Sequence, residues 1–244
     1  MLSQRTIKNK ITCSGVGLHT GKKVKLTFHP AEPNTGILFR RIDGDKVVDI
    51  PATAKNVGET TLSTTLVYGD YKISTIEHLL SALAGTGVDN CIIDCDGPEI
   101  PIMDGSSTQF VFLIQTAGIV EQNAVKKFVY VTKSVQVQRD DAVARIKPYD
   151  GFRVTFTLEF DHPVYNKYPH SASIDFSQTS FIREVSRART FGLMDDLEKL
   201  KKMNLALGAN LNNAIGIGDE DVLNEGGLRF ADEFVKHKIL DAIG

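Results

Sequence analysis

The order of predicted strands and helices constrains this chain of 244 residues most, because the same order occurs twice. Each half begins with short runs of alternating apolar and polar residues. It then continues with a helix, a strand and another helix. Strands and helices that do not alternate strictly favour an α+β fold over a doubly wound parallel sheet. We therefore expect an α+β protein with a duplicated architecture, although the sequence itself does not repeat.

Apolar periodicity locates the individual elements. The segment 75–85 has the clearest helical pattern, since its apolar residues recur at i, i+3, i+4 and i+7. Ser74 and Glu77 have capping-box spacing, and Gly85 is expected to end this helix. The pattern predicts further strands at 23–28, 37–42, 47–52, 64–68, 91–94, 128–138, 142–148, 152–160 and 214–218, and further helices at 107–117, 179–188, 195–204 and 232–244.

A polar segment at 118–127 is the best candidate for a domain boundary, since it separates a helix from a new group of strands. The predicted domains are residues 1–122 and 123–244. At about 150 residues per domain, the chain length agrees with one large domain or two compact ones.

Composition excludes several classes of protein. The 28 basic and 30 acidic residues give a net charge of −2, which lacks the basic footprint of a nucleic-acid-binding protein. Three cysteines cannot all pair, so a reducing, cytoplasmic environment is expected. The longest apolar runs are far shorter than the ~20 residues of a membrane helix. We therefore expect a soluble protein without stable membrane insertion, for which a lipid is a ligand or a substrate.

Two predicted helices carry residues suited to metal chemistry. His237 and Asp241 are four residues apart, so they lie on one face of the last helix and can hold one zinc ion. The same spacing is also typical of a pair that merely stabilises a helix. Glu77 and His78 open the helix at 75, where the alternative is a capping glutamate beside a satisfied histidine.

Together, the two helices supply three possible ligands and a spare carboxylate for a catalytic zinc site. His78, His237 and Asp241 would leave the fourth zinc position open, as in catalytic rather than structural sites. Glu77 would then act as general base toward water. The chain has no HExxH motif, so it lacks the helix of thermolysin-like proteases. Iron(II) is an alternative to zinc, because two histidines and one carboxylate suit both metals.

Several blocks resemble one bacterial family, the UDP-3-O-acyl-N-acetylglucosamine deacetylases, which are zinc hydrolases of lipid A biosynthesis. The similarity extends from the beginning to the end of the chain and is carried by residues 14–31, 75–90, 98–107, 186–192 and 223–244. It implies two α+β domains of similar topology packed together, each with a small insert. The inserts would be 53–70, near the zinc, and 193–213, which would form a passage for an acyl chain lined by Leu193, Leu197, Leu200 and Leu205.

The resemblance also implies roles for individual residues. The zinc ligands would be His78, His237 and Asp241, and Glu77 would be the general base. Thr190 would donate a hydrogen bond to the developing oxyanion. The expected substrate contacts are Lys238, His19, Leu18, Phe191 beside the sugar and Phe160 beside the uracil ring.

The function implied is hydrolysis of the N-acetyl group of UDP-3-O-(3-hydroxyacyl)-N-acetylglucosamine, the committed step of lipid A biosynthesis. The expected partner is this small lipid-linked UDP-sugar, and the expected oligomeric state is a monomer. Members of the family continue beyond the position of Gly244 with an aspartate and a later catalytic histidine. We therefore expect that the chain is truncated and that its turnover is reduced or lost.

Two alternative functions remain open at this point. The first is a non-catalytic protein that binds acyl-UDP-sugars, which the missing histidine favours and the retained Glu77 disfavours. The second is a zinc hydrolase of the same fold that acts on another N-acyl sugar.

Overall fold

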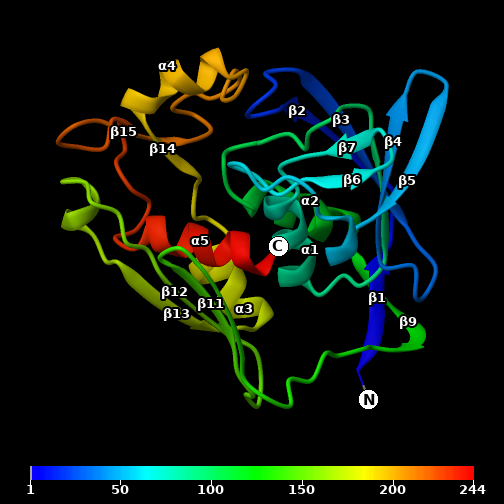
Figure 1. Cartoon of the computed structure of the whole chain (residues 1–244). Coiled ribbons are helices and arrows are strands. Elements are labelled where there is room, and N and C mark those ends of the chain that lie inside the picture. The colour runs from blue at the N-terminus through cyan, green and yellow to red at the C-terminus, as the bar shows by residue number, and fades with distance from the viewer. Residues whose placement is uncertain (1) are drawn as a thin grey trace.

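A five-stranded sheet forms one side of the molecule in a computed structural model that describes residues 2–244 (Figure 1). Its strand order is β2-β3-β8-β4-β5. Strands β4 and β8 are parallel, and the other neighbours are antiparallel. The chain is thus α+β, as predicted. In the order of the sheet, the strands span Ile11–Val16, Lys23–Pro30, Cys91–Cys95, Ile37–Asp43 and Lys46–Pro51.

Two helices, α1 (Glu77–Thr86) and α2 (Thr108–Ala117), cover one face of this sheet (Figure 1). Alternate residues of β3, such as Leu26 and Phe28, are fully buried and share one apolar core with Leu79 of α1. Apolar residues at alternate positions of the strand and at helical spacing on α1 therefore pack into the same core.

A third helix, α5 (Glu233–Ile243), packs against α1 and against a hairpin of β12 (Arg153–Thr157) and β13 (Ser171–Asp175). Figure 1 shows α5 between α1 and this hairpin, with the end of the chain beside α1. The helices thus meet in the middle of the molecule, and the face shared by α1 and α5 brings residues 77–86 and 233–243 together.

Small residues on α1 allow a close approach of the second half of the chain. A Cβ atom on Gly85 would lie 2.0 Å from the ring of Phe181, a fully buried residue. Because α1 continues to Thr86, Gly85 lies inside the helix, and the prediction that it ends the helix is wrong. The helix ends at Gly87, whose φ of 77° is the left-handed conformation that glycine adopts without strain.

The predicted capping box at the start of α1 is also wrong. Ile76 occupies the N-cap position, and no side chain caps the helix there. The hydroxyl of Ser74 donates to the carbonyl of Pro98, and the carboxylate of Glu77 accepts from the N–H of Thr64. Bonds to other segments therefore replace the local pair.

The polar segment at 118–127, predicted as a domain boundary, forms strand β9 (Ile119–Val125), which pairs with β1 (Ser3–Ile7). Its polar side chains take part in tertiary hydrogen bonds, because Gln122 bonds to Asn90 and to the carbonyl of Ala31. The predicted boundary at 122/123 therefore falls within a strand. The division into two domains and their similar topology stay predictions.

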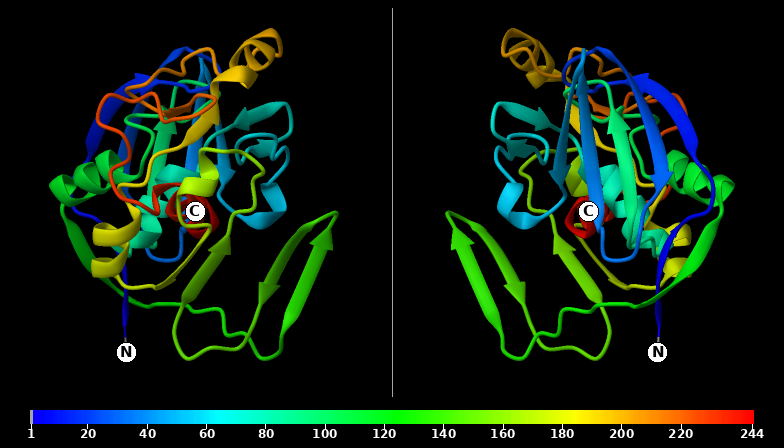
Figure 2. Two further views of the ribbon diagram at one scale, coloured as in Figure 1. Left: turned by 90° about the vertical axis from the view of Figure 1, so that its left-hand side faces the viewer. Right: turned by 90° about the vertical axis from the view of Figure 1, so that its right-hand side faces the viewer.

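The remaining strands of the second half pair two by two in the part of the chain that the structure describes. The hairpin of β10 (Val135–Arg139) and β11 (Ala142–Ile146) stands apart from the rest, and all its residues are exposed (Figure 2). The strand predicted at 128–138 is shorter than expected, because only 135–139 has a partner strand. The other pair is β14 (Phe191–Leu193) with β15 (Ile215–Ile217), which are parallel.

The predicted helices of the second half have different outcomes. Segment 179–188 forms a short α3 (Gln178–Ser180) followed by a π-helical turn, Phe181–Val185. Segment 195–204 is confirmed as α4 (Met194–Lys202). The first predicted insert contains a 3₁₀ turn at Ala54–Asn56 and strand β6 (Leu66–Tyr68), which pairs with β7 (Tyr71–Ile73). Within residues 2–244, no helix is long and apolar enough to cross a bilayer.

Candidate metal centre

Helices α1 and α5 bring three metal-ligating side chains together. His78 comes from α1, and His237 and Asp241 come from α5, one turn apart on the same face. One ligand atom from each lies within 4.8 Å of the others. Asp241 Oδ1 is 3.6 Å from Nε2 of His78 and 3.4 Å from Nε2 of His237. The structure therefore brings together the three ligands predicted from the sequence.

The spacing of these atoms fits a tetrahedral metal. With zinc–ligand bonds of about 2.0–2.1 Å, neighbouring ligand atoms of a tetrahedron lie about 3.3–3.4 Å apart. The two Asp241 distances are close to this value. Asp241 Oδ1 is buried and has no hydrogen-bond donor among residues 2–244, which is unfavourable unless another group binds it. The donor set thus fits a bound divalent cation.

Burial prepares these ligands in the forms that a metal requires. It lowers the pKa of His78, and it lowers the pKa of His237 to about 3, so both imidazoles are neutral at pH 7. Burial alone would raise the pKa of Asp241, but the neighbouring imidazoles and the charge and hydrogen bond of Lys238 leave it below its ordinary value. Two neutral imidazoles and an ionised carboxylate are the metal-binding forms.

The two histidines are held in different ways. His237 Nδ1 lies 3.0 Å from the carbonyl oxygen of Ala188, to which it donates when protonated, so that Nε2 is free to bind a metal. His78 Nδ1 is buried and has no hydrogen-bond partner in the described chain. The two rings meet edge to face, with centroids 4.9 Å apart.

Glu77 lies next to His78 at the first position of α1 and is buried. Burial raises the pKa of its carboxyl group to about 7, and the negative charge of Asp241 acts in the same direction. Backbone N–H groups of Glu77 and Thr64 oppose this shift. A carboxyl group with a pKa near 7 can both accept and return a proton at neutral pH. The contact with Thr64 also brings the predicted first insert to the cluster.

Lys238, Phe191 and Thr190 lie around the same site. The ammonium of Lys238 is 2.9 Å from Asp241 Oδ2 and 5.2 Å from the centroid of the Phe191 ring. The ring of Phe191 is 6.0 Å from that of His237. The backbone of Thr190 is bonded on both sides, since its N–H donates to Gly105 and its carbonyl accepts from Ile215. The distances place Lys238 and Phe191 beside the cluster, whereas the roles of all three residues stay predictions.

Phe160 connects to the site through other aromatic rings. Its ring centroid is 4.9 Å from Tyr165, which is 5.7 Å from Phe191 and 5.0 Å from Phe234. The sequence analysis did not single out Tyr165 as a neighbour of the site. Phe160 itself is 45% exposed, so it presents an open aromatic face at the end of this row.

His19 and Leu18 lie beside the second predicted insert. His19 Nδ1 accepts from the N–H of Ala206, and the carbonyl of Leu18 accepts from Gly208. No hydrogen bond or ion pair within residues 2–244 joins either residue to the metal cluster. Four leucines predicted to line an acyl passage are half-buried: Leu193, Leu197, Leu200 and Leu205.

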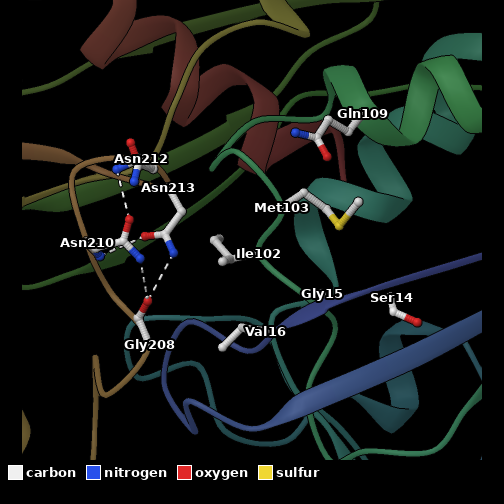
Figure 3. Close-up of a pocket in the computed structure, with 10 residues that line it drawn as sticks. All are labelled: Ser14, Gly15, Val16, Ile102, Met103, Gln109, Gly208, Asn210, Asn212 and Asn213. Carbon is white, nitrogen blue, oxygen red and sulfur yellow. Dashed lines mark hydrogen bonds between the residues drawn. The ribbon is translucent and has the colours of Figure 1, made fainter.

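A cleft of about 380 Å³ lies between the end of strand β2 and the loop at 208–213 (Figure 3). Its lining does not include the metal cluster. Figure 3 shows that the asparagines of this loop bond to the loop itself, as Asn213 Nδ2 does to the carbonyl of Gly208 and Asn210 N–H does to Asn213 Oδ1. The side chains of Asn210 and Asn213 are thus engaged within the loop.

Comparison with known proteins places the chain in a family. The sequence pattern of the UDP-3-O-acyl N-acetylglycosamine deacetylases matches residues 4–244. A curated UDP-3-O-acyl-N-acetylglucosamine deacetylase from Methylococcus capsulatus is 60% identical over 244 residues, which are the whole of this chain and 80% of that relative.

The chain belongs to this deacetylase family. The resemblance found in the sequence is thus confirmed, and the family is one of enzymes. The family match includes both α1 and α5, and hence every residue of the cluster.

Sequence analysis did not single out two further residues on the segments that carry this deacetylase-family site, Glu233 and Arg189. Glu233 is fully buried, and its carboxylate accepts two hydrogen bonds from the side chain of Arg189. A signal was present, because Glu233, His237 and Asp241 follow one another at intervals of four and so share one helix face. A buried charge on the face that carries metal ligands indicates a role beside them.

Proposed function

We propose that this chain hydrolyses the N-acetyl group of UDP-3-O-(3-hydroxyacyl)-N-acetylglucosamine in a zinc-dependent reaction that gives the free amine and acetate. The observation that carries the proposal is the convergence of His78, His237 and Asp241 beside a buried Glu77, in a chain of the deacetylase family. On this proposal the reaction is the committed step of lipid A biosynthesis.

The three ligands would hold the metal, with iron(II) as an alternative ion. A bound zinc ion would supply Lewis acidity, polarising the acetamide carbonyl and lowering the pKa of water to about 7. Glu77 would accept the proton of the attacking water, which its pKa of about 7 allows at neutral pH. The departing amine needs a proton, and protonated Glu77 is a group of this chain that can return it.

Other residues would orient the substrate and stabilise charge. The hydroxyl of Thr190 would donate to the oxyanion that develops on the acetyl carbonyl, from a backbone held in place on both sides. Lys238 would bring a positive charge next to Asp241 and toward the sugar-nucleotide. Phe191 would pack beside the sugar and Phe160 beside the uracil ring, along the row of aromatic rings.

The remaining expected contacts lie in or beside the second insert. His19 and Leu18 would contact the substrate from the loop that meets Ala206 and Gly208. The half-buried leucines of segment 193–205 would line a passage for the acyl chain. A cytoplasmic location and a monomeric state stay predictions.

The alternative of a non-catalytic binder of acyl-UDP-sugars is disfavoured, because the chain retains both the ligand cluster and a glutamate with the pKa of a catalytic base. A hydrolase of another N-acyl sugar predicts turnover of amides that lack the nucleotide.

The test is to measure zinc content and acetate release for the unsubstituted chain and for Glu77→Gln. We expect one zinc per chain in both proteins and acetate release about 10²–10⁴-fold slower from Glu77→Gln than from the unsubstituted chain. A chain that folds but binds no divalent metal would overturn the metal site. Zinc binding with equal residual rates in both proteins would overturn the role of Glu77.

A further inference from the structure

The carbonyl that orients His237 belongs to a segment that is bonded to the helix of His237 itself. Ala188 supplies this carbonyl, and the next residue, Arg189, is bonded to Glu233. Glu233 lies one helical turn before His237 on α5, on the same face. The bond between Arg189 and Glu233 therefore fixes the Ala188 carbonyl relative to the helix that carries His237.

Both oxygens of the Glu233 carboxylate accept two hydrogen bonds each, and three of these four bonds come from Arg189. Glu233 Oε1 accepts from Arg189 Nε at 2.8 Å and from its backbone N–H at 3.1 Å. Oε2 accepts from Arg189 Nη2 at 3.1 Å and from the backbone N–H of Arg229 at 2.6 Å. Arg189 Nη2 also donates to the carbonyl of Gly227. Glu233 is 0% exposed, so this is a fully buried and fully bonded carboxylate.

A second arm fixes the same segment from the other side. Arg229 donates to the carbonyl of Arg187 and, through Nη2, to Asp104 Oδ2 at 2.9 Å. The backbone positions on both sides of Ala188 are thus tied to neighbouring elements. The Ala188 carbonyl cannot turn away from His237 unless these bonds break.

Stability alone explains this pair poorly. Burying two charges carries a desolvation penalty that their attraction often only offsets, and apolar pairs of similar size can be as stable. By contrast, the partner on the second nitrogen of a metal-binding histidine sets its tautomer and orientation, and loss of such partners weakens metal binding.

We infer that Glu233 and Arg189 are positioning residues that hold the Ala188 carbonyl against His237 and so keep Nε2 of His237 unprotonated and directed at the metal. This inference rests on the proposed function, because it concerns the same metal site. Neither residue touches the metal ligands' donor atoms, so both act through the carbonyl.

The test uses Glu233→Gln, which keeps the shape of the side chain but removes its charge. We expect zinc affinity, measured by competition with a chromophoric chelator, to fall about 10–100-fold. In the metal-free protein, ¹⁵N NMR of the imidazole should show His237 protonated at Nδ1 in the unsubstituted chain. In Glu233→Gln it should show a mixture of the two tautomers.

The matched control is Asp89→Asn, which weakens another partly buried ion pair. Asp89 lies 2.8 Å from Lys126 and accepts from the backbone N–H of Arg5, away from the cluster. We expect this variant to unfold at a lower temperature while its zinc affinity and the His237 tautomer stay unchanged. If Glu233→Gln behaves in the same way, the pair is merely structural and the inference is wrong.

Two further variants decide the inference if Glu233→Gln does not fold. Arg189→Lys keeps the positive charge but loses the fork of donors, so it should weaken zinc binding less than Glu233→Gln does. The double variant Glu233→Met with Arg189→Met replaces the buried charges by apolar groups, and unchanged zinc affinity in it would overturn the inference. If the unsubstituted chain binds no zinc, the proposed function fails, whereas the tautomer in the metal-free variants still decides the inference.

Discussion

Helices α1 and α5 contribute to the same cluster, but they support their ligands differently. The α5 histidine has an anchored partner, the Ala188 carbonyl, and the α5 carboxylate bonds to Lys238. The α1 histidine has no such partner on its second nitrogen within residues 2–244. What α1 adds instead is Glu77, a buried group with a pKa near neutrality.

This difference suggests a division of tasks. A pre-arranged pair of ligands on α5 provides the rigid part of the metal site, since bound side chains lose less freedom when the metal arrives. The α1 helix completes the ligand set and carries the proton-transfer group. Because α1 packs on the five-stranded sheet and α5 packs on the hairpin of β12 and β13, the metal site lies between two layers of the molecule.

Removal of either histidine should have the largest effect and can break the comparison. We expect His78→Ala and His237→Ala each to reduce zinc content at least ~10-fold, because three protein ligands are the usual number in a catalytic zinc site. Zinc per chain is measured after dialysis against buffered zinc.

The two variants should differ when metal is absent. His237→Ala leaves the buried Ala188 carbonyl without its partner, which costs about 1–3 kcal/mol, whereas His78→Ala breaks no hydrogen bond of its ring. Urea unfolding of the metal-free proteins should therefore show the greater loss in His237→Ala. Equal losses would mean that the two histidines are anchored alike.

Substitution of Glu77 should separate the chemistry of α1 from its metal binding. Glu77→Gln removes the group that accepts a proton, so we expect acetate release to fall about 10²–10⁴-fold. Zinc content should stay at the level of the unsubstituted chain, since Glu77 is not among the three ligands. A parallel loss of zinc would instead make Glu77 part of the metal site.

Much of this site follows from residue type and spacing, and the rest from tertiary contacts. The interval of four between His237 and Asp241 places them on one helix face, and apolar periodicity predicts α1 correctly. That α1 and α5 meet was implied only by the family resemblance. Spacing within a helix cannot show which helices pack together.

Three features escaped sequence reasoning for related physical reasons. The Ala188 carbonyl is a backbone atom, so no residue type marks it as the partner of His237. Glu77 has the spacing of a capping residue, but Thr64, thirteen positions away, binds its carboxylate. Strand β9 has the polar composition of a linker because its side chains bond to distant groups. In each case a long-range hydrogen bond overrides the local pattern.

Through its two cluster histidines, acid should destabilise the metal-free protein, and the loss of stability that each histidine causes reveals the share of its helix. Burial lowers the folded-state pKa of His78 and His237, that of His237 to about 3, whereas both titrate near ~6.5 when unfolded. Between these values the unfolded chain binds more protons, so stability present above pH 6.5 is lost as pH falls. We expect His237 to cause a loss of roughly 1–2 kcal/mol between pH 7 and pH 5 and His78 a further loss, whereas Glu77, whose folded-state pKa is raised to about 7, opposes both.

The measurement is urea unfolding at both pH values after treatment with a chelator. His237→Gln should remove the acid destabilisation that comes from α5, and His78→Gln should remove that from α1. The free energy of unfolding of each variant should therefore fall less between pH 7 and pH 5 than that of the unsubstituted chain. His170→Gln, which replaces an exposed histidine, is the control and should keep the full dependence. A loss of stability at pH 5 that survives both cluster substitutions would assign the acid sensitivity to other groups.

The smallest effect is expected at Ser81, the residue one turn beyond His78. Its hydroxyl is fully buried and, like His78 Nδ1, has no hydrogen-bond partner in the chain from residue 2 onward. Ser81→Ala removes a buried polar group that gains nothing in return, so the free energy of unfolding should stay constant or rise by up to about 1 kcal/mol. Ser107→Ala is the control, since its hydroxyl donates to the carbonyl of His78 at 2.8 Å and its loss should destabilise by about 1 kcal/mol.

Zinc affinity of Ser81→Ala should change less than about threefold, well below the 10–100-fold loss typical when a partner of a metal-binding histidine is removed. A tenfold loss would show that Ser81 supports His78 as the Ala188 carbonyl supports His237, and the contrast between the two helices would disappear.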